Sequence, residues 1–357
     1  WFQQLRDRLD AENQKPHVLS RAGEGGGGGD GGVLLCERGA RLLGLRLPGV
    51  DHNLVFTATG GDGLLTGGDR LWLAPEVGWF WPSLSEARRD PKSTAATPAE
   101  VDPGEYAVVS SSPTHLELRD PRVVVTDVRD GKSLGLALTR RFDLIDPPAA
   151  HVDGLTTLSF RITNTVTRAG RDRSIDGAVA GCWDILQVPP TGTLVCPTTT
   201  RAAVRSYYDP FGDRHVAVDD ARVRFLVDSK RRVKMGLLAE HTTGRMAYYR
   251  PLPDGRATLI LRVFAPLPGE PYCDIPRDAP DSQRLGGDAL QAYNDDGDAF
   301  PGSDGFGEME YHDPCLVIGR EPAARSGASV THALAGPDAA VRAAGTALLG
   351  TPIDPIT

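Results

Sequence analysis

The sequence is poor in cysteine and has no long apolar run, and each shortage excludes a class of protein. Its five cysteines are odd in number, widely scattered and without any C-x-x-C pair. We therefore expect five reduced thiols rather than a disulfide scaffold or a zinc site. No apolar run approaches the roughly 20 residues that a membrane-spanning helix needs, so no membrane partner is expected.

Positive charge is also in short supply. The chain has 39 Lys and Arg against 47 Asp and Glu, a formal net charge of -8 and a pI near 5.5. We therefore expect no general attraction to nucleic acid or to an anionic membrane. The chain begins Trp1-Phe2-Gln3 without a basic and apolar leader, which favours a cytoplasmic protein over a secreted one.

Familiar catalytic and phosphate-binding patterns are missing as well. H-E-x-x-H does not occur, which argues against zinc proteases. The glycine run of residues 25–29 lacks the Lys and Ser or Thr that follow in a phosphate-binding loop. Its high backbone entropy favours a surface loop instead.

What the sequence does contain is a long series of short apolar runs separated by turn residues. Gly and Pro number 41 and 28, which suits many strands joined by turns. Leu158, Phe160 and Ile162 alternate with polar residues, the period-two pattern of a half-buried strand. The ranges expected to be strands are 33–37, 53–58, 70–75, 106–111, 115–120, 122–128, 134–145, 156–166, 221–228, 233–239, 247–251 and 257–266. Because they do not alternate with helices, the sequence predicts a mainly β fold, a large antiparallel β-sandwich.

Helical patterns are confined to the two ends of the chain. Phe2, Leu5 and Leu9 share one side of a helix within residues 1–14, and residues 337–350 form a second helical pattern. No break in composition marks a second domain. We expect one sandwich domain over 1–357, with an N-terminal helix and glycine-rich loop in 1–32, the sandwich in 33–334 and a C-terminal helix and tail in 335–357.

The first segment that could carry chemistry is residues 67–82. Three of the five tryptophans fall within ten residues here, beside Arg70 and Glu76. Aromatic faces such as that of Trp72 stack on the C–H faces of sugars, while Arg and carboxylate groups bind hydroxyls, so the segment suits a carbohydrate groove. The alternative is a tryptophan-rich edge of the core that holds an Arg–Glu ion pair.

The second segment runs from residue 287 to residue 314. Glu308, Glu310 and His312 project from the same face of an extended chain. Titratable groups crowded in this way perturb one another, which acid–base catalysis requires. Asn294 precedes this strand and is a candidate for binding substrate. The alternative is a solvated edge strand.

The same segment is rich in aspartate. Carboxylate oxygens at Asp295, Asp296, Asp298 and Asp304 make a calcium loop conceivable, but Pro301 falls where an EF-hand needs glycine. We expect no cofactor and no metal ligands, with a divalent cation such as calcium as the alternative.

Three further residues are candidates for binding substrate. Trp183, in the segment 180–188, could be a sugar platform or part of the core. Lys234 and His241 flank a strand pair. A structural histidine is the alternative for His241.

Three stretches together resemble the galactose mutarotase-like superfamily, which includes the aldose 1-epimerases, and in particular an uncharacterised bacterial branch of it. They are LSFRITNTVTRAG (158–170), GGDRLWLAPE (67–76) and GFGEMEYHDPCL (305–316). The resemblance implies a large β-sandwich with a Glu on a late strand, here Glu308 or Glu310, as base at the anomeric hydroxyl. It also implies a histidine acid at the ring oxygen. The sequence lacks the family's Asn-His-x-Tyr-Phe-Asn segment, and His241 and His312 are substitutes by composition only.

These observations lead to three hypotheses about function. The first is an enzyme that acts on a sugar or oligosaccharide by acid–base chemistry, either epimerase-like or by glycosidic bond cleavage. Its catalytic residues would be Glu308, Glu310 and His312, and Glu76 with Glu310 is the carboxylate pair for cleavage. The second is a carbohydrate-binding protein without turnover. The third is a structural or partner-binding sandwich, which predicts that Trp72 and Trp79 are buried in the core. The residues expected to hold the sugar are Arg70, Trp72, Glu76, Trp183, Lys234, His241 and Asn294.

Overall fold

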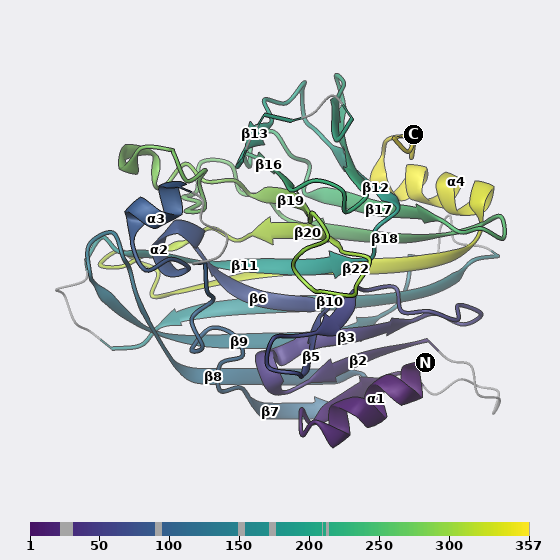
Figure 1. Cartoon of the computed structure of the whole chain (residues 1–357), viewed down its shortest axis with the longest axis horizontal. Helices are drawn as coiled ribbons and strands as arrows, with labels where there is room; N and C mark the ends of the chain where they lie inside the picture. Colours follow the sequence, from purple (N-terminus) through teal and green to yellow (C-terminus); the bar gives the residue numbers. More distant parts are fainter. Residues whose placement is uncertain are drawn as a thin grey trace.

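The protein is built from two large antiparallel sheets that pack face to face (Figure 1). The computed structural model describes residues 1–21, 31–89, 95–148, 154–170, 176–208, 210–211 and 214–356. The predicted glycine-rich loop at 25–29 lies outside these residues. The mainly β class and the sandwich architecture are confirmed.

The first sheet carries the candidate site. Its order is β1 (Pro16–Leu19), β2 (Gly32–Cys36), β3 (Arg41–Arg46), β6 (Asp69–Ala74), β11 (Val179–Val188), β20 (Gly307–His312), β19 (Leu290–Asn294), β16 (Val233–Leu237) and β13 (Arg205–Ser206), and β21 (Leu316–Val317) pairs with one end of β11. Strands distant in sequence are therefore neighbours at its centre, where β11 lies between β6 and β20.

The second sheet closes the other side of the core. Its order is β14 (Val216–Val218), β15 (Arg222–Val227), β12 (Gly192–Pro197), β17 (Arg245–Pro251), β18 (Arg256–Phe264), β22 (Ala324–Pro337), β10 (Thr156–Arg168), β9 (Ser133–Ile145), β8 (His115–Thr126) and β7 (Ala107–Ser112). On β10, Phe160 and Ile162 are buried in the core while Arg161 between them is exposed. The predicted alternation of this strand is confirmed.

Both predicted terminal helices are present, and each covers part of an outer sheet face. Helix α1 (Phe2–Ala11) buries Phe2 and Leu9 against Leu34 and Leu43 of the first sheet. Helix α4 (Asp338–Leu349) packs on β17, β18 and β22 of the second sheet. Two short helices, α2 (Glu76–Trp79) and α3 (Leu84–Arg89), were not predicted. No helix in the described part of the chain is long and apolar enough to cross a membrane.

Some strand predictions were wrong in extent or missing. Of the run 53–58, only its end enters a strand, the short β4 (Thr57–Thr59), which pairs with β5 (Leu65–Gly67). The two runs at 115–120 and 122–128 form one strand, β8, with a register shift between Asp120 and Val123. The fourteen residues of β22 were not predicted at all.

A fully buried charge network joins the two sheets through the core. Arg140 of β9 bonds both Asp69 and Asp184, at 2.9 Å to the latter. Arg262 of β18 also pairs with both aspartates, and Asn164 donates to Asp184 at 2.7 Å. Two positive and two negative charges balance, as buried ions require. All five cysteines are free and buried.

Candidate functional site

The candidate residues gather on the outer face of the first sheet because side chains alternate along its central strands. On β20, Glu308, Glu310 and His312 share this face, as their spacing predicts, whereas Met309 and Tyr311 face the core. Strand pairing places three rows across the face: Trp72, Trp183 and His312; Arg70, Ile185, Glu310 and Gln291; and Gln187, Glu308, Tyr293 and Lys234. We call these side chains the outer-face cluster. β20 is a central strand and not the solvated edge strand of the alternative.

Glu308 is held at one side of the cluster by two donors. Its Oε1 accepts hydrogen bonds from Arg70 Nη2 at 2.8 Å and from Gln187 Nε2 at 2.9 Å. The Arg70 guanidinium also lies 4.1 Å from the centre of the Trp72 ring, within cation–π range. This geometry presents a carboxylate, a guanidinium and an aromatic face together.

Glu310 lies deeper and pairs with an ammonium. Its Oε2 accepts a hydrogen bond from Trp183 Nε1 at 2.7 Å and lies 3.1 Å from Lys234 Nζ. Burial raises the pKa of Glu310 to about 8, with Lys234 acting in the opposite direction and Glu308 adding to the rise. Burial alone would lower the pKa of Lys234, but Glu310, Glu76 and Asp274 raise it above its ordinary value. Both directions favour the protonated form, so Glu310, which is 0% exposed, is a neutral acid at neutral pH beside the Lys234 ammonium.

His312 is neutral and stacks on Trp183. The two ring centres are 5.4 Å apart with 21° between the planes. Burial, and then the charge of Lys234, lower the pKa of His312 well below its usual value, so it is no imidazolium acid at neutral pH.

Several buried polar atoms of the outer-face cluster have no hydrogen-bond partner. They are Gln187 Oε1, Gln291 Oε1, Glu310 Oε1 and both ring nitrogens of His312. Buried polar atoms are normally paired with protein or water. The cluster therefore has spare capacity to bind a polar ligand.

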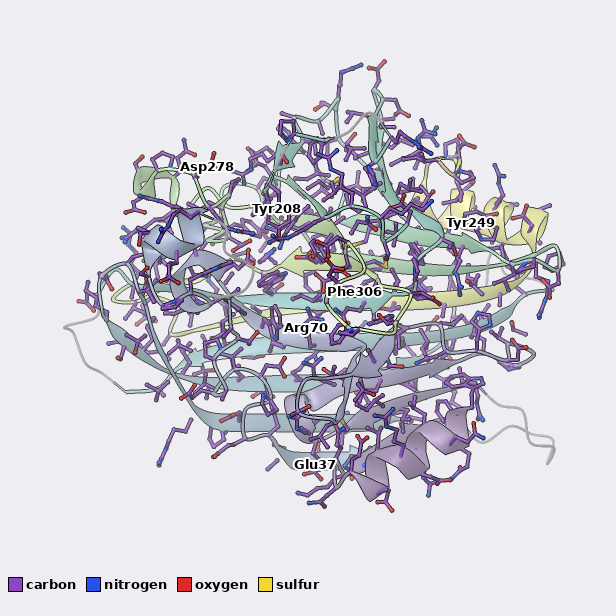
Figure 2. The ribbon with its side chains drawn as sticks, in the orientation of Figure 1. Glu37, Arg70, Tyr208, Tyr249, Asp278 and Phe306 are labelled. Carbon is purple, nitrogen blue, oxygen red and sulfur yellow. The ribbon has the colours of Figure 1, made fainter. Side chains whose placement is uncertain are left out.

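A cavity of about 390 Å³ opens beside the cluster. Its lining includes Arg70, Trp72 and Gln187, together with Phe300 and Phe306. Figure 2 shows Arg70 and Phe306 close to the middle of this face. A larger cavity of about 860 Å³ is lined by Arg168, residues 316–323 and their neighbours. No residue of the outer-face cluster borders it, so we place the site at the smaller cavity.

The remaining predicted residues lie in different places. Glu76 begins α2, is half-buried, and its amide donates to Asp274 Oδ1 at 2.7 Å. The Asn294 side chain is used by the chain itself: it bonds the backbone of Asp228, Ser229 and Arg231, which fixes that turn.

His241 and the other tryptophans are not members of the outer-face cluster. The carbonyl of His241 accepts from the Thr199 amide in the turn between β16 and β17. Trp79 and Trp81 are buried in the core, as the structural hypothesis predicts for Trp79, whereas Trp72 is only partly buried and lines the cavity.

Sequence reasoning missed three residues that shape the site. Gln187 shares the face of Trp183 at i, i+4 on β11, a spacing that could have found it. The other two, Asp102 and Asp274, come from irregular segments with no periodic signal. Asp102 accepts a hydrogen bond from Trp72 Nε1 at 2.8 Å and pairs with Arg41.

Within the described ranges, no group of three or more His, Cys, Asp or Glu side chains could hold a metal ion. In the aspartate-rich loop, Asp295 accepts hydrogen bonds from the Tyr293 hydroxyl and the Gly297 amide. The expectation of no metal ligands stays a prediction, and calcium binding by this loop stays its alternative.

Comparison with known proteins agrees with the fold. A family model described as a family of unknown function (DUF6786) matches residues 58–357, and no curated protein matches the sequence. A candidate aldose 1-epimerase from Escherichia coli K12 is similar in structure, with a TM-score of 0.54 and 11% identity over 90% of this chain and 99% of that one. A candidate aldose 1-epimerase from Klebsiella pneumoniae gives a TM-score of 0.46 and 10% identity, covering 96% and 94% of the two chains. A galactose mutarotase related enzyme from Lactobacillus acidophilus gives 0.43 and 9%, covering 88% and 97%. The fold of the chain is thus similar to that of the Escherichia coli structure.

Proposed function

The chain belongs to this family of unknown function, DUF6786, and for it we propose a carbohydrate-active enzyme that acts on an aldose by epimerase-like acid–base chemistry. The observation that carries the proposal is the pair of carboxyl groups on β20, Glu308 and Glu310, beside a cavity lined by Arg70 and Trp72. Two groups in such different surroundings suit separate acid and base roles. The fold type shared with the aldose 1-epimerase structures is consistent with this proposal.

In the proposed reaction, the Glu308 carboxylate takes the proton of the anomeric hydroxyl while Glu310 donates a proton to the ring oxygen. The bond between the anomeric carbon and the ring oxygen breaks, which gives the open-chain aldehyde. Rotation about the next carbon–carbon bond and the reverse proton transfers close the ring as the other anomer. Residues two apart on a strand face are about 6–7 Å apart, so the carboxyl groups can flank one sugar.

The cavity residues take binding roles in this proposal. Trp72 stacks on the sugar ring, and Arg70 and Gln187 hold both Glu308 and a sugar hydroxyl. Lys234 keeps a positive charge beside Glu310 and stabilises it once the proton has left. Neutral His312 forms hydrogen bonds with the sugar through its ring nitrogens.

Sugar binding without turnover is the second candidate function. It is favoured by one observation, the complete burial of the Glu310 side chain, because a catalytic acid must reach its substrate.

The test is proton NMR of the anomeric region, with a panel of aldoses and oligosaccharides. The wild-type protein should speed exchange between the α and β anomers of at least one aldose. Glu308→Gln and Glu310→Gln should each reduce this acceleration by about 100-fold or more. Exposed Glu240 supplies a matched control, since Glu240→Gln should leave it unchanged.

Other spectra would contradict the proposal in distinct ways. Saturation transfer to a sugar without faster anomer exchange means a binding protein. New reducing-end signals mean glycosidic bond cleavage. Full activity in Glu310→Gln would remove Glu310 from the mechanism.

A further inference from the structure

The four outer edges of the two sheets are protected to very different degrees. An exposed edge strand can pair with another chain unless it is short, charged, twisted by a β-bulge or interrupted by proline; of these devices β7 has only one register shift, between Val108 and Ser110. In the first sheet, β13 has two residues, and β1 begins at Pro16 directly after Lys15. In the second sheet, β14 has three residues. The fourth edge, β7, has six residues, none of them charged or proline.

Strand β7 is also unusually open to solvent. All six of its residues are exposed, which holds for no other strand among the described residues. Only four large hydrophobic residues of that part of the chain are exposed, and two of them are on β7: Val108 at 36% and Val109 at 57%. A register shift against β8 falls between Val108 and Ser110 and leaves Val109 without a partner there. Figure 1 shows β7 at the outer edge of its sheet, beyond β8.

We propose that β7 is a self-association surface, on which a second copy of this chain pairs its own β7 antiparallel across a two-fold axis. Such a contact is isologous and closes after two copies. With the axis between Val109 and Ser110, Ala107 of each copy lies opposite Ser112 of the other. The paired edges join two ten-stranded sheets into one and bury both pairs of valines.

The charges at the two ends of β7 favour a second copy of the same chain. Exposed Glu105 lies just before the strand. At the other end, the Pro113 carbonyl accepts a hydrogen bond from the Ser20 amide, which places Arg21 beside the turn that follows β7. Antiparallel pairing brings the Glu105 of each copy to the Arg21 end of the other. Arg21 also forms an exposed ion pair with Asp146, so at each end of the paired strands Glu105 of one copy adds a second carboxylate to this arginine of the other.

The dimer should be weak, because six residues from each copy bury less than a standard protein interface. Sedimentation velocity over a hundredfold range of concentration should show a reversible monomer–dimer equilibrium. In hydrogen exchange at high concentration, amides of residues 107–112 should be protected relative to low concentration. Val109→Lys, which puts two like charges near the axis, should weaken dimerisation at least tenfold.

A matched control separates pairing of β7 from nonspecific hydrophobic association. Leu267 is 46% exposed and lies in the loop after β18, so Leu267→Lys removes a similar exposed apolar group but should leave the dimer unchanged. Circular dichroism checks that both variants fold. A chain that stays monomeric at every concentration overturns the proposal, and so does a dimer that Val109→Lys leaves intact. Protection confined to segments other than 107–112 overturns it as well.

Discussion

At the scale of single residues, burial and pairing compete at Glu310. Its carboxyl group has an ammonium and an indole N–H as partners, yet burial raises its pKa from 4.5 to about 8. Removing a carboxylate from water therefore costs more than these two partners return. At neutral pH this favours the protonated acid, the form that the proposed reaction needs as a proton donor.

The raised pKa makes folding stability depend on pH. The folded state holds the Glu310 proton up to pH of about 8, whereas the unfolded chain releases it near 4.5. The stabilisation is complete below pH 4.5 and is lost as pH rises to about 8. Glu310→Gln removes this titration, so its free energy of unfolding should fall less steeply between pH 5 and 8 than that of the wild type.

Urea titrations at several pH values measure this difference. Asp313 supplies a comparison away from the cavity, since burial raises its pKa to about 8 as well. Asp313→Asn should flatten the same pH window, but only Glu310→Gln should change sugar turnover. An unchanged slope in Glu310→Gln would mean that Lys234 keeps the carboxyl group ionised.

Much of the candidate site could be predicted at this scale. The i, i+2, i+4 spacing of Glu308, Glu310 and His312 sufficed to place them on one face. The partners Arg70 and Trp183 were chosen by chemistry, and strand pairing brings them there. Asn294 shows the limit of such reasoning. Its side-chain oxygen already accepts hydrogen bonds from the backbone of a nearby turn, and the sequence contains no signal of this contact.

At the scale of elements, one glycine permits the entry into β6. Gly68 has φ of +65°, and a Cβ built there would lie 1.8 Å from the carbonyl oxygen of Leu42. No side chain fits without moving β3, which carries Leu42. The entry into β6 therefore depends on this residue.

Gly68→Ala should destabilise the fold by about 3 kcal/mol or more, from the strained φ together with the clash. Gly131 has a similar φ of +70° with nothing within 4 Å of the added Cβ. Gly131→Ala should therefore cost only the backbone strain, about 1 kcal/mol. Urea denaturation compares the two variants, and equal losses would contradict the role given to the Leu42 contact.

Strands were predictable where one face is buried and the other is exposed to solvent, because apolar and polar residues then alternate, as in β10 with its Phe160 and Ile162. β11 is buried at all ten positions, so it has no alternation that would identify it as a strand. β22 is built largely of Ala, Ser and Gly, whose small side chains give a weak apolar pattern. Strand order could not be predicted, because β10 pairs with a strand more than 150 residues away.

At the scale of the whole molecule, the charge network of the core ties one sheet to the other. Asp184 of β11 contacts both Arg140 and Arg262, which come from two strands of the opposite sheet. Asp184→Asn would leave two fully buried guanidinium groups with only Asp69 as counter-charge. The free energy of unfolding should fall by about 3–5 kcal/mol.

Thermal and urea unfolding measure this loss, and an exposed pair provides the reference. Asp220 is 92% exposed and lies 3.4 Å from Arg201, so Asp220→Asn should change stability by less than about 1 kcal/mol. A loss in Asp184→Asn as small as that would mean that water or Asn164 compensates for the missing charge.

The position of β22 in the middle of its sheet also determines when the molecule can fold. This last strand of the chain, residues 324–337, fills the place between β10 and β18. A nascent chain that ends before it has two unjoined halves of a sheet, with the exposed edges of β10 and β18 still waiting for a partner. Folding dominated by such distant contacts is slow. The fold therefore cannot be completed before residues 324–337 have been synthesised, and until then those edges are open to chaperones or to aggregation.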